Sequence, residues 1–242
     1  MRITTVLFDL GSTLLYSKDP WPPIYARADR ALVRSLKAAG IRLDPSAGYG
    51  DFDTFLDAYY AERGAGTVER TTFAALRDLL AGKGFPDVPE AVLRASLDDM
   101  YAVTQRNWYL ENDAVHTLAL LQRSGYRLGL ISNTSDDKNV QQLVDRWSLR
   151  AYFELILTSA GCGIRKPDPA IFRIALDHFR VRPGAAAMIG DTPEADIQGA
   201  NGLGLYAIWI TRRSEKTDPQ PARPDAVVST LEEIPAALAA VR

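Results

Sequence analysis

The sequence contains a single cysteine, Cys162, and no long uninterrupted hydrophobic run. One thiol excludes a disulfide bridge within the chain and fits a reducing compartment. The apolar run at the N-terminus is broken by Asp9 and is too short for the core of a signal peptide. No segment approaches the length needed to cross a bilayer. We therefore expect a cytoplasmic protein with no membrane partner.

The sequence also lacks an excess of charge of either sign. It has 28 basic and 30 acidic side chains, which gives a net charge of −2 at pH 7. Nucleic-acid-binding domains present a basic surface, so we expect no nucleic-acid partner. A chain of 242 residues can bury a sizeable core, as one large domain or as a core domain with an insertion. The composition is compatible with a monomer or a homodimer.

Strand and helix patterns alternate in the second half of the sequence. Apolar strand patterns occur at residues 126–132, 153–158, 186–189, 206–210 and 226–228. Helical patterns occur at residues 113–123, 136–147, 169–179, 193–202 and 231–241. Such alternation is typical of right-handed βαβ units on a parallel sheet. We predict an α/β fold with a doubly wound, Rossmann-like parallel sheet, to which the apolar residues 6–8 contribute a further strand.

A long helical stretch separates the first strand from these βαβ units. Its helical patterns cover residues 24–39, 52–63, 71–80 and 89–107. Pro22 and Pro23 precede the first of them and Gly40 follows it, as is usual at helix starts and ends. The sequence thus predicts a core made of residues 1–16 and 111–242, with an inserted helical domain at 17–110. Residues 212–224, rich in charge and proline, are predicted to form a mobile loop.

Chemically reactive side chains stand where the predicted strands end. Asp9 ends the first strand, Ser132 ends the strand at 126–132, Lys166 precedes the helix at 169–179, and Asp191 follows the strand at 186–189. Because parallel strands present their carboxyl ends at one edge of a sheet, we expect these side chains to share a crevice. An aspartate is a competent nucleophile toward phosphorus. Carboxylates and a carbonyl, such as that of Gly11, suit Mg²⁺.

Further polar residues flank these four positions. Ser132 and Lys166 are candidates to bind and neutralise the oxygens of a transferring phosphoryl group, and Asn133 to bind beside them. Ser12 and Thr13 either shape the turn after the first strand or contact phosphate, through the main chain or the side chain. Asp196 lies on a helix that begins at Thr192-Pro193. It is either a metal ligand or a residue that orients Asp191 or a water molecule.

In order and spacing, the four segments resemble the motifs of the haloacid dehalogenase superfamily. The resemblance covers residues 1–16 and 111–242. It implies that Asp9 is a nucleophile that forms an aspartyl phosphate, that Ser132 and Lys166 bind the phosphoryl group, and that Asp191 binds Mg²⁺ with Asp196 nearby. It also implies that residues 17–110 form a helical cap that closes over the site and selects the substrate. We expect a Mg²⁺-dependent phosphatase whose substrate is a small phosphate ester.

The sequence departs from the superfamily's phosphatase pattern at Gly11. Such phosphatases usually carry a second aspartate there, two residues after the nucleophile, as general acid to the leaving group and base toward water. A positioned acid or base typically contributes about 10²–10⁴-fold to the rate. Two alternatives therefore stand beside the phosphatase. One is a 2-haloacid dehalogenase, which also lacks the second aspartate; the other is a regulatory protein that binds phosphate and metal with weakened catalysis.

Two positions favour the phosphatase over the dehalogenase. Asp191 and Asp196 supply metal-binding carboxylates, whereas the dehalogenases that resemble this chain carry small polar residues in place of Asp191 and need no Mg²⁺. Those dehalogenases also place a tyrosine six residues after the lysine, where this chain has Phe172. The lysine segment itself is shared by both branches and does not distinguish them.

Overall fold

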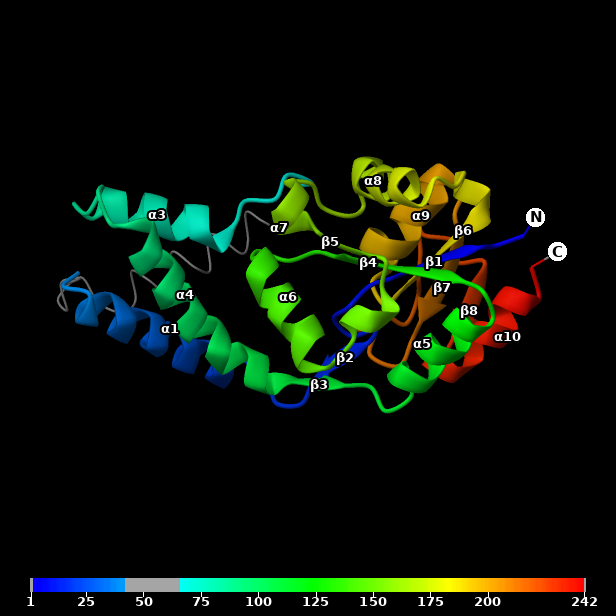
Figure 1. Cartoon of the computed structure of the whole chain (residues 1–242), viewed down its shortest axis with the longest axis horizontal. Coiled ribbons are helices and arrows are strands. Elements are labelled where there is room, and N and C mark those ends of the chain that lie inside the picture. Colours follow the sequence, from blue (N-terminus) through cyan, green and yellow to red (C-terminus); the bar gives the residue numbers. More distant parts are fainter. Residues whose placement is uncertain (1, 42–65, 242) are drawn as a thin grey trace. The chain divides into compact units, whose positions relative to one another are not determined.

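The computed structural model describes residues 2–41 and 66–241, which divide into two compact units. The sheet unit comprises Met1–Tyr16 and Tyr109–Arg242, and the helical unit comprises Ser17–Trp108 (Figure 1). The helix expected at residues 52–63 lies outside the described residues. No helix in the described ranges has both the length and the apolar character required to span a bilayer.

The sheet unit contains six strands, all of which pair in parallel, in the order β5-β4-β1-β6-β7-β8. The strands are β1 (Thr5–Phe8), β4 (Arg127–Ser132), β5 (Leu155–Thr158), β6 (Ala186–Gly190), β7 (Tyr206–Ile210) and β8 (Ala226–Val228). The central strands β1 and β6 are buried along their whole length, as expected for a parallel sheet covered on both faces. The predicted α/β fold is confirmed.

Helices cover both faces of this sheet. Figure 1 shows α8 (Pro169–Phe179) and α9 (Gln198–Leu203) on the face opposite to α5 (Ala114–Arg123) and α10 (Ile234–Ala239). The remaining helices of this unit are α6 (Asp137–Arg146) and the short α7 (Ser159–Cys162). The helix expected at 193–202 is divided: a π-helical turn, Pro193–Ile197, precedes α9. The helix expected at 231–241 likewise starts with a 3₁₀ turn, Leu231–Glu233.

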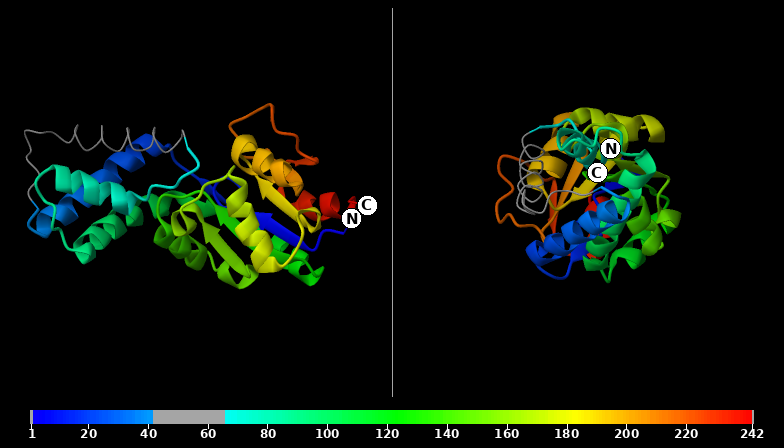
Figure 2. Two further views of the ribbon diagram at one scale, coloured as in Figure 1. Left: turned by 90° about the horizontal axis from the view of Figure 1, so that it is seen from above. Right: turned by 90° about the vertical axis from the view of Figure 1, so that its left-hand side faces the viewer.

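Close packing between α8 and the sheet depends on a glycine. A Cβ atom added at Gly129 of β4 would lie 2.8 Å from the ring of Phe179 and 2.9 Å from Leu7. Both side chains are buried, and together with Phe172 they form part of one apolar core. At the other end of the unit, residues 2–4, which lead into the first strand, lie beside residues 238–241 of the C-terminal segment (Figure 2).

The strand order determines where a ligand site is expected. From β1 the chain proceeds to β4 and β5 on one side, and from β6 it proceeds to β7 and β8 on the other. The connections that leave β1 and β6 therefore diverge. In open α/β sheets such a switch point opens a crevice at the carboxyl ends of the strands. Asp9 and Asp191 directly follow these two strands.

The helical unit contains α1 (Trp21–Ala38), α3 (Thr72–Gly82) and α4 (Glu90–Thr104), with a 3₁₀ turn at Gln105–Asn107. Helix α1 packs on α4, and their apolar faces enclose a core that includes Leu32, Leu97 and Met100. The segments that leave and re-enter the sheet unit, β2 (Leu15–Ser17) and β3 (Trp108–Leu110), pair in a two-stranded sheet. The sequence did not predict these two short strands.

Candidate active site

A buried lysine joins two carboxylates at the edge of the sheet. Asp9 is only 8% exposed, and its Oδ1 accepts a hydrogen bond from Lys166 Nζ at 2.6 Å. The same ammonium forms an ion pair with Asp196 Oδ1 at 2.6 Å and donates to the carbonyl of Ile131 at 2.7 Å. The loops that follow β1 and β6 are therefore linked through one positive charge.

The loop before α8 holds Lys166 in place. The side-chain amide of Asn133 accepts from Lys166 N at 2.8 Å and donates to Lys166 O at 2.9 Å. Asp168 caps α8 by accepting from Ala170 N at 2.9 Å, and Pro169 occupies the first turn. Asn133, a predicted phosphate-binding residue, thus directs its amide to the main chain of Lys166, where it positions the lysine.

Three carboxylates converge beside this lysine. Asp9, Asp191 and Asp196 each offer an oxygen, and these oxygens lie within 4.8 Å of one another. Thr13 Oγ1 lies 3.4 Å from Asp191 Oδ1, and Asp196 Oδ2 accepts from Thr192 N at 3.1 Å. Both oxygens of Asp196 are thus engaged within the protein.

Asp196 can occupy its position only because residue 190 is glycine. A Cβ atom at Gly190 would lie 2.2 Å from the carboxyl carbon of Asp196. Any other side chain at this position would displace the carboxylate. The Gly-Asp pair that ends β6 therefore has two separate roles: the glycine makes room for Asp196, and Asp191 carries the next carboxylate.

The carboxylates are more basic than isolated aspartates. Burial raises the pKa of Asp9 to about 6, with Lys166 acting to lower it and Asp196 to raise it further. Burial and the nearby charges of Asp9 and Asp196 raise the pKa of Asp191 to about 8. Burial alone would lower the pKa of Lys166, but the carboxylates of Asp196 and Asp9 raise it above its usual range. The cluster therefore holds more negative charge than its lysine compensates.

Such a cluster fits a divalent cation. Its oxygen donors are hard ligands of the kind that Mg²⁺ prefers. Burial raises the pKa values of Asp9 and Asp191, and three carboxylates face the one positive charge of Lys166, so a second positive charge would balance the group. A cation among these oxygens would supply that charge.

Ser132, Gly11 and Ser12 complete the predicted set. Ser132 ends β4 and is buried, and within the described ranges its hydroxyl has no hydrogen-bond partner. It adjoins Ile131, whose carbonyl accepts from Lys166, so the two residues lie at one edge of the sheet. Gly11 lies in the turn between β1 and β2, and Ser12 there has a left-handed φ of 58°. Ser12 therefore helps to form the turn through its main chain.

Sequence reasoning missed two residues that hold Asp191. The carbonyl of Asp191 accepts from Ser214 Oγ at 2.7 Å and from Trp209 Nε1 at 3.0 Å. Trp209 lies on β7 and is buried, while Ser214 lies in the loop that follows. The acceptor is a main-chain atom, so no residue type in the sequence indicated the contact.

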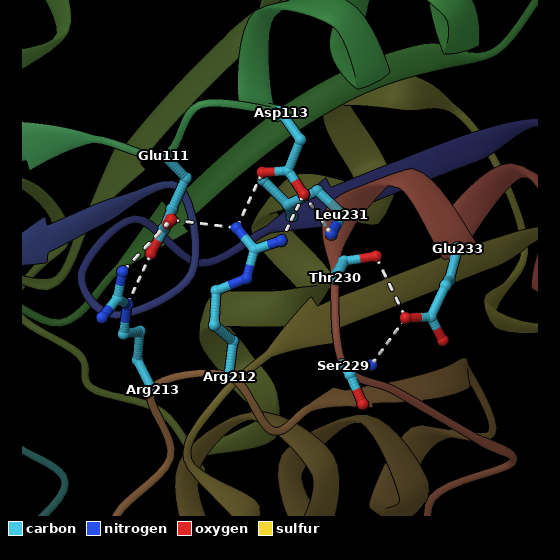
Figure 3. Close-up of polar contacts among 8 residues, drawn as sticks. All are labelled: Glu111, Asp113, Arg212, Arg213, Ser229, Thr230, Leu231 and Glu233. Atoms are coloured by element: carbon cyan, nitrogen blue, oxygen red, sulfur yellow. Dashed lines mark hydrogen bonds and ion pairs between the residues drawn. The ribbon is translucent and has the colours of Figure 1, made fainter.

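The loop that carries Ser214 is anchored by a second charged cluster (Figure 3). Arg212 bonds to Asp113 through both terminal nitrogens, at 2.9 and 2.5 Å, and to Glu111 at 2.9 Å. Arg213 donates to Glu111 at 2.7 Å and lies 4.3 Å above the ring of Tyr16. Residues 212–224 form a loop as expected, but ion pairs fix its first two residues.

A carboxylate cluster and a buried lysine at the switch point of a parallel sheet are typical of α/β proteins whose ligand sites lie at the carboxyl edge of the sheet. A family model described as haloacid dehalogenase-like hydrolase matches residues 3–204. The chain belongs to this family and is therefore a hydrolase, as the resemblance of its motifs implied.

Relatives in this family carry several activities. Ribulose-1,5-bisphosphate 5-phosphatase of Halopiger xanaduensis is 31% identical over 226 residues, which cover 89% of this chain and 87% of the relative. Phosphoserine phosphatase of Thermus thermophilus is 40% identical over 130 residues. These residues make up 54% of this chain and 51% of the relative, so the match spans about half of that protein. A crystal structure of a 2-haloacid dehalogenase from Pseudomonas syringae superposes with a TM-score of 0.68 at 27% identity, covering 98% of both chains.

Proposed function

We propose that this hydrolase is a Mg²⁺-dependent phosphatase that acts on a small phosphorylated metabolite. The observation that carries the proposal is the convergence of Asp9, Asp191 and Asp196 around Lys166 at the switch point of the sheet. Two curated relatives named as phosphatases support the same reaction class. The cluster's excess of negative charge accounts for the need for a cation.

In the proposed reaction, the Asp9 carboxylate attacks phosphorus and the ester oxygen leaves, which gives an aspartyl phosphate that water then hydrolyses. Lys166 keeps Asp9 ionised and offers its ammonium to the phosphoryl oxygens. The hydroxyl of Ser132 and the turn at Ser12 and Thr13 provide further donors. Asn133 acts by fixing Lys166.

The proposed metal ligands are Asp9, Asp191 and the carbonyl of Gly11. When bound, Mg²⁺ would neutralise charge on the phosphoryl oxygens. Asp196, whose oxygens face Lys166 and Thr192 N, orients the metal ligands without binding the metal itself. Such outer partners of metal ligands fix the orientation of those ligands.

Gly11 leaves the leaving-group oxygen without the usual proton donor. We expect fast turnover only with leaving groups that depart as stable anions, such as p-nitrophenolate. The variant Gly11→Asp should raise turnover of an alkyl phosphate by about 10²-fold, at the lower end of the effect of a positioned acid. An unchanged rate in a correctly folded variant would mean that another residue already supplies the proton.

We further propose that residues 1–16 and 111–242 are the catalytic core and that residues 17–110 are a cap that selects the substrate. The division of the chain into a sheet unit and a helical unit supports these roles. Every candidate catalytic side chain belongs to the sheet unit. The helical unit is thus free to vary with the substrate.

Hydrolysis of p-nitrophenyl phosphate tests the proposal. We expect turnover with Mg²⁺, none with EDTA, and none in Asp9→Asn. The matched control is Asp177→Asn, which neutralises an exposed carboxylate of α8 and should leave turnover unchanged. Equal rates with Mg²⁺ and EDTA would refute the metal, and activity in Asp9→Asn would refute the nucleophile.

Dehalogenation is the second candidate, favoured by the structural neighbour named 2-haloacid dehalogenase and by the absence of a side chain at Gly11. It predicts release of halide from 2-chloropropionate in the presence of EDTA. The three-carboxylate cluster opposes it, since carbon–halogen cleavage by an aspartate requires no metal. A regulatory protein, the third reading, would bind Mg²⁺ and phosphate with no turnover across a panel of phosphate esters.

A further inference from the structure

A cavity of about 470 Å³ lies wholly within the helical unit. We call it the arginine cavity, because four arginines line it: Arg27, Arg30, Arg34 and Arg106. The first three project from α1, and Arg106 comes from the 3₁₀ turn that follows α4. One acidic side chain, Asp19, also lines it. The formal charge of the described lining is therefore strongly positive.

The three arginines of α1 follow one stripe of the helix. Positions three and four residues apart are neighbours on a helix surface, so Arg30 lies beside both Arg27 and Arg34. Like charges at such spacing destabilise a helix. The only acidic residue of α1, Asp29, falls outside this stripe. Repulsion along the stripe is therefore uncompensated within the helix.

None of the four guanidinium groups forms an ion pair or hydrogen bond within the part of the chain that the structure describes. Other arginines of the same unit do. Arg70 pairs with Asp78 at 3.1 Å, and Arg94 pairs with Asp98 at 3.2 Å. Carboxylates are thus available in this unit, yet none in the described ranges pairs with the four arginines of the cavity. An anionic ligand would supply the missing partners.

One end of the cavity is fixed in advance. The buried side chain of Asn107 accepts from Asp19 N at 2.8 Å and donates to Asp19 O at 2.9 Å. Ile24, which is 4% exposed, provides an apolar wall from α1. A preformed cavity spares a ligand part of the ordering cost of binding.

We propose that the arginine cavity binds a small polyanion, such as a molecule that carries two phosphates or a phosphate and a carboxylate. Guanidinium groups bind both anions through paired hydrogen bonds, and several converging arginines select a ligand with more than one anionic group. The polyanion is either a substrate with a second anionic group or a separate ligand. The site belongs to the helical unit alone, so its existence does not depend on the proposed reaction.

Binding of inorganic pyrophosphate tests the site, measured by calorimetry at low salt with protein from which metal has been removed on a chelating resin. Without a metal, the carboxylates around Lys166 repel anions, so the sheet unit does not compete. We expect the double variant Arg30→Gln/Arg34→Gln to bind at least 10-fold more weakly than the wild type. The control Arg70→Gln/Arg77→Gln removes two charges from the same unit, away from the cavity, and should bind like the wild type.

Two results would overturn the proposal: no pyrophosphate binding by the wild type, or undiminished binding by the double variant. If Arg30→Gln/Arg34→Gln does not fold, as judged by thermal unfolding, then Arg27→Gln/Arg106→Gln provides the same test. Binding should also weaken as salt rises, because exposed charges are screened. This outcome is independent of whether the protein hydrolyses any phosphate ester.

Kinetics then identify the source of the anion. If the cavity receives a substrate's second anionic group, the double variant should lower kcat/KM for ribulose 1,5-bisphosphate, relative to p-nitrophenyl phosphate, by at least 10-fold. If it receives a separate ligand, the double variant should bind pyrophosphate more weakly while keeping the wild-type ratio of kcat/KM for these two substrates. The kinetic results identify the source of the anion. The calorimetric comparison decides whether the polyanion site exists.

Discussion

Two clusters of buried charge in the sheet unit differ in their balance. Around Lys166, three carboxylates share one ammonium. In the cluster of Glu111, Asp113, Arg212 and Arg213, two carboxylates meet two guanidinium groups (Figure 3). The pKa of Asp9 and of Asp191 is raised, whereas the hydrogen bonds of Arg212 outweigh burial and lower the pKa of Asp113. The unbalanced cluster could hold an added cation, and the balanced one is neutral without it.

The residue types match these roles. Arginine presents a rigid fork that satisfies a carboxylate through two parallel hydrogen bonds, as Arg212 does with Asp113. Lysine is a compact charge whose three donors point in different directions; Lys166 donates to Asp9 and to a carbonyl, and it forms an ion pair with Asp196. The balanced cluster fixes a loop. The unbalanced cluster around Lys166 brings together side chains that follow separate strands and leaves part of their negative charge uncompensated.

Removing Lys166 should have the largest effect. Lys166→Met deletes the ammonium of the unbalanced cluster, and we expect p-nitrophenyl phosphate turnover to fall at least about 10²-fold, as for loss of one charge-stabilising donor. Arg213→Met is the matched control, since Glu111 keeps its bond to Arg212. Its turnover should stay within a few-fold of the wild type. Equal losses in the two variants would contradict the division of roles.

Breaking the balanced cluster should instead affect stability. Asp113→Asn leaves Arg212, 21% exposed, without its main partner, and we expect a loss of about 2–4 kcal/mol in the free energy of unfolding. Glu154→Gln is the control: Glu154 and its partner Arg127 are 45% and 42% exposed, so the loss should be below about 1 kcal/mol. Urea unfolding measures both. Similar losses would show that burial adds nothing to the Asp113 pair.

The lysine cluster illustrates what the sequence could predict. Asp9, Lys166 and Asp191 stand at the ends of predicted strands or before a predicted helix, and the topology of a parallel sheet brings such positions together. The short apolar segments that alternate with helical patterns, together with residues 6–8, predicted every strand of the six-stranded sheet. Residue type and position sufficed, because the determining contacts are those of regular secondary structure.

The balanced cluster of Glu111, Asp113, Arg212 and Arg213 illustrates what the sequence could not predict. Arg212 lies in a segment whose charge and proline content are typical of mobile loops, and its partners Glu111 and Asp113 are far away in the chain. Likewise, the sequence placed Asn133 at the site but not the direction of its amide, which faces Lys166. Strands β2 and β3 have three residues each, too few for a periodic pattern to appear.

The two clusters should also respond oppositely to pH. Asp9 and Asp191 bind protons more tightly in the folded than in the unfolded state, so the metal-free protein should lose stability as pH rises from about 4 to about 8. Asp113 has a lowered pKa, so its contribution is present above the unfolded value of 3.8 and is lost as pH falls below it. Urea unfolding in EDTA at a series of pH values measures the sum.

Asp191→Asn separates the two contributions. It removes the carboxylate with the larger upward shift, and we expect the loss of stability between pH 5 and pH 8 to shrink by about 1–2 kcal/mol. Saturating Mg²⁺ should flatten the wild-type profile in the same range, because a bound cation favours the ionised carboxylates. If Asp191→Asn leaves the pH dependence of the free energy of unfolding unchanged, the cluster does not carry excess negative charge in solution.

The smallest effect tests the connection between the clusters. Ser214 follows the anchored arginines and donates to the carbonyl of Asp191, so the balanced cluster holds a proposed metal ligand of the unbalanced one. One hydrogen bond contributes about 0.5–1.5 kcal/mol, so Ser214→Ala should raise the Mg²⁺ concentration for half-maximal turnover by about 3- to 10-fold. Ser124→Ala, which removes a hydroxyl bonded within α5, should not change it. Equal Mg²⁺ dependence in the two variants would show that Trp209 alone holds Asp191 and that the anchored loop serves only the fold.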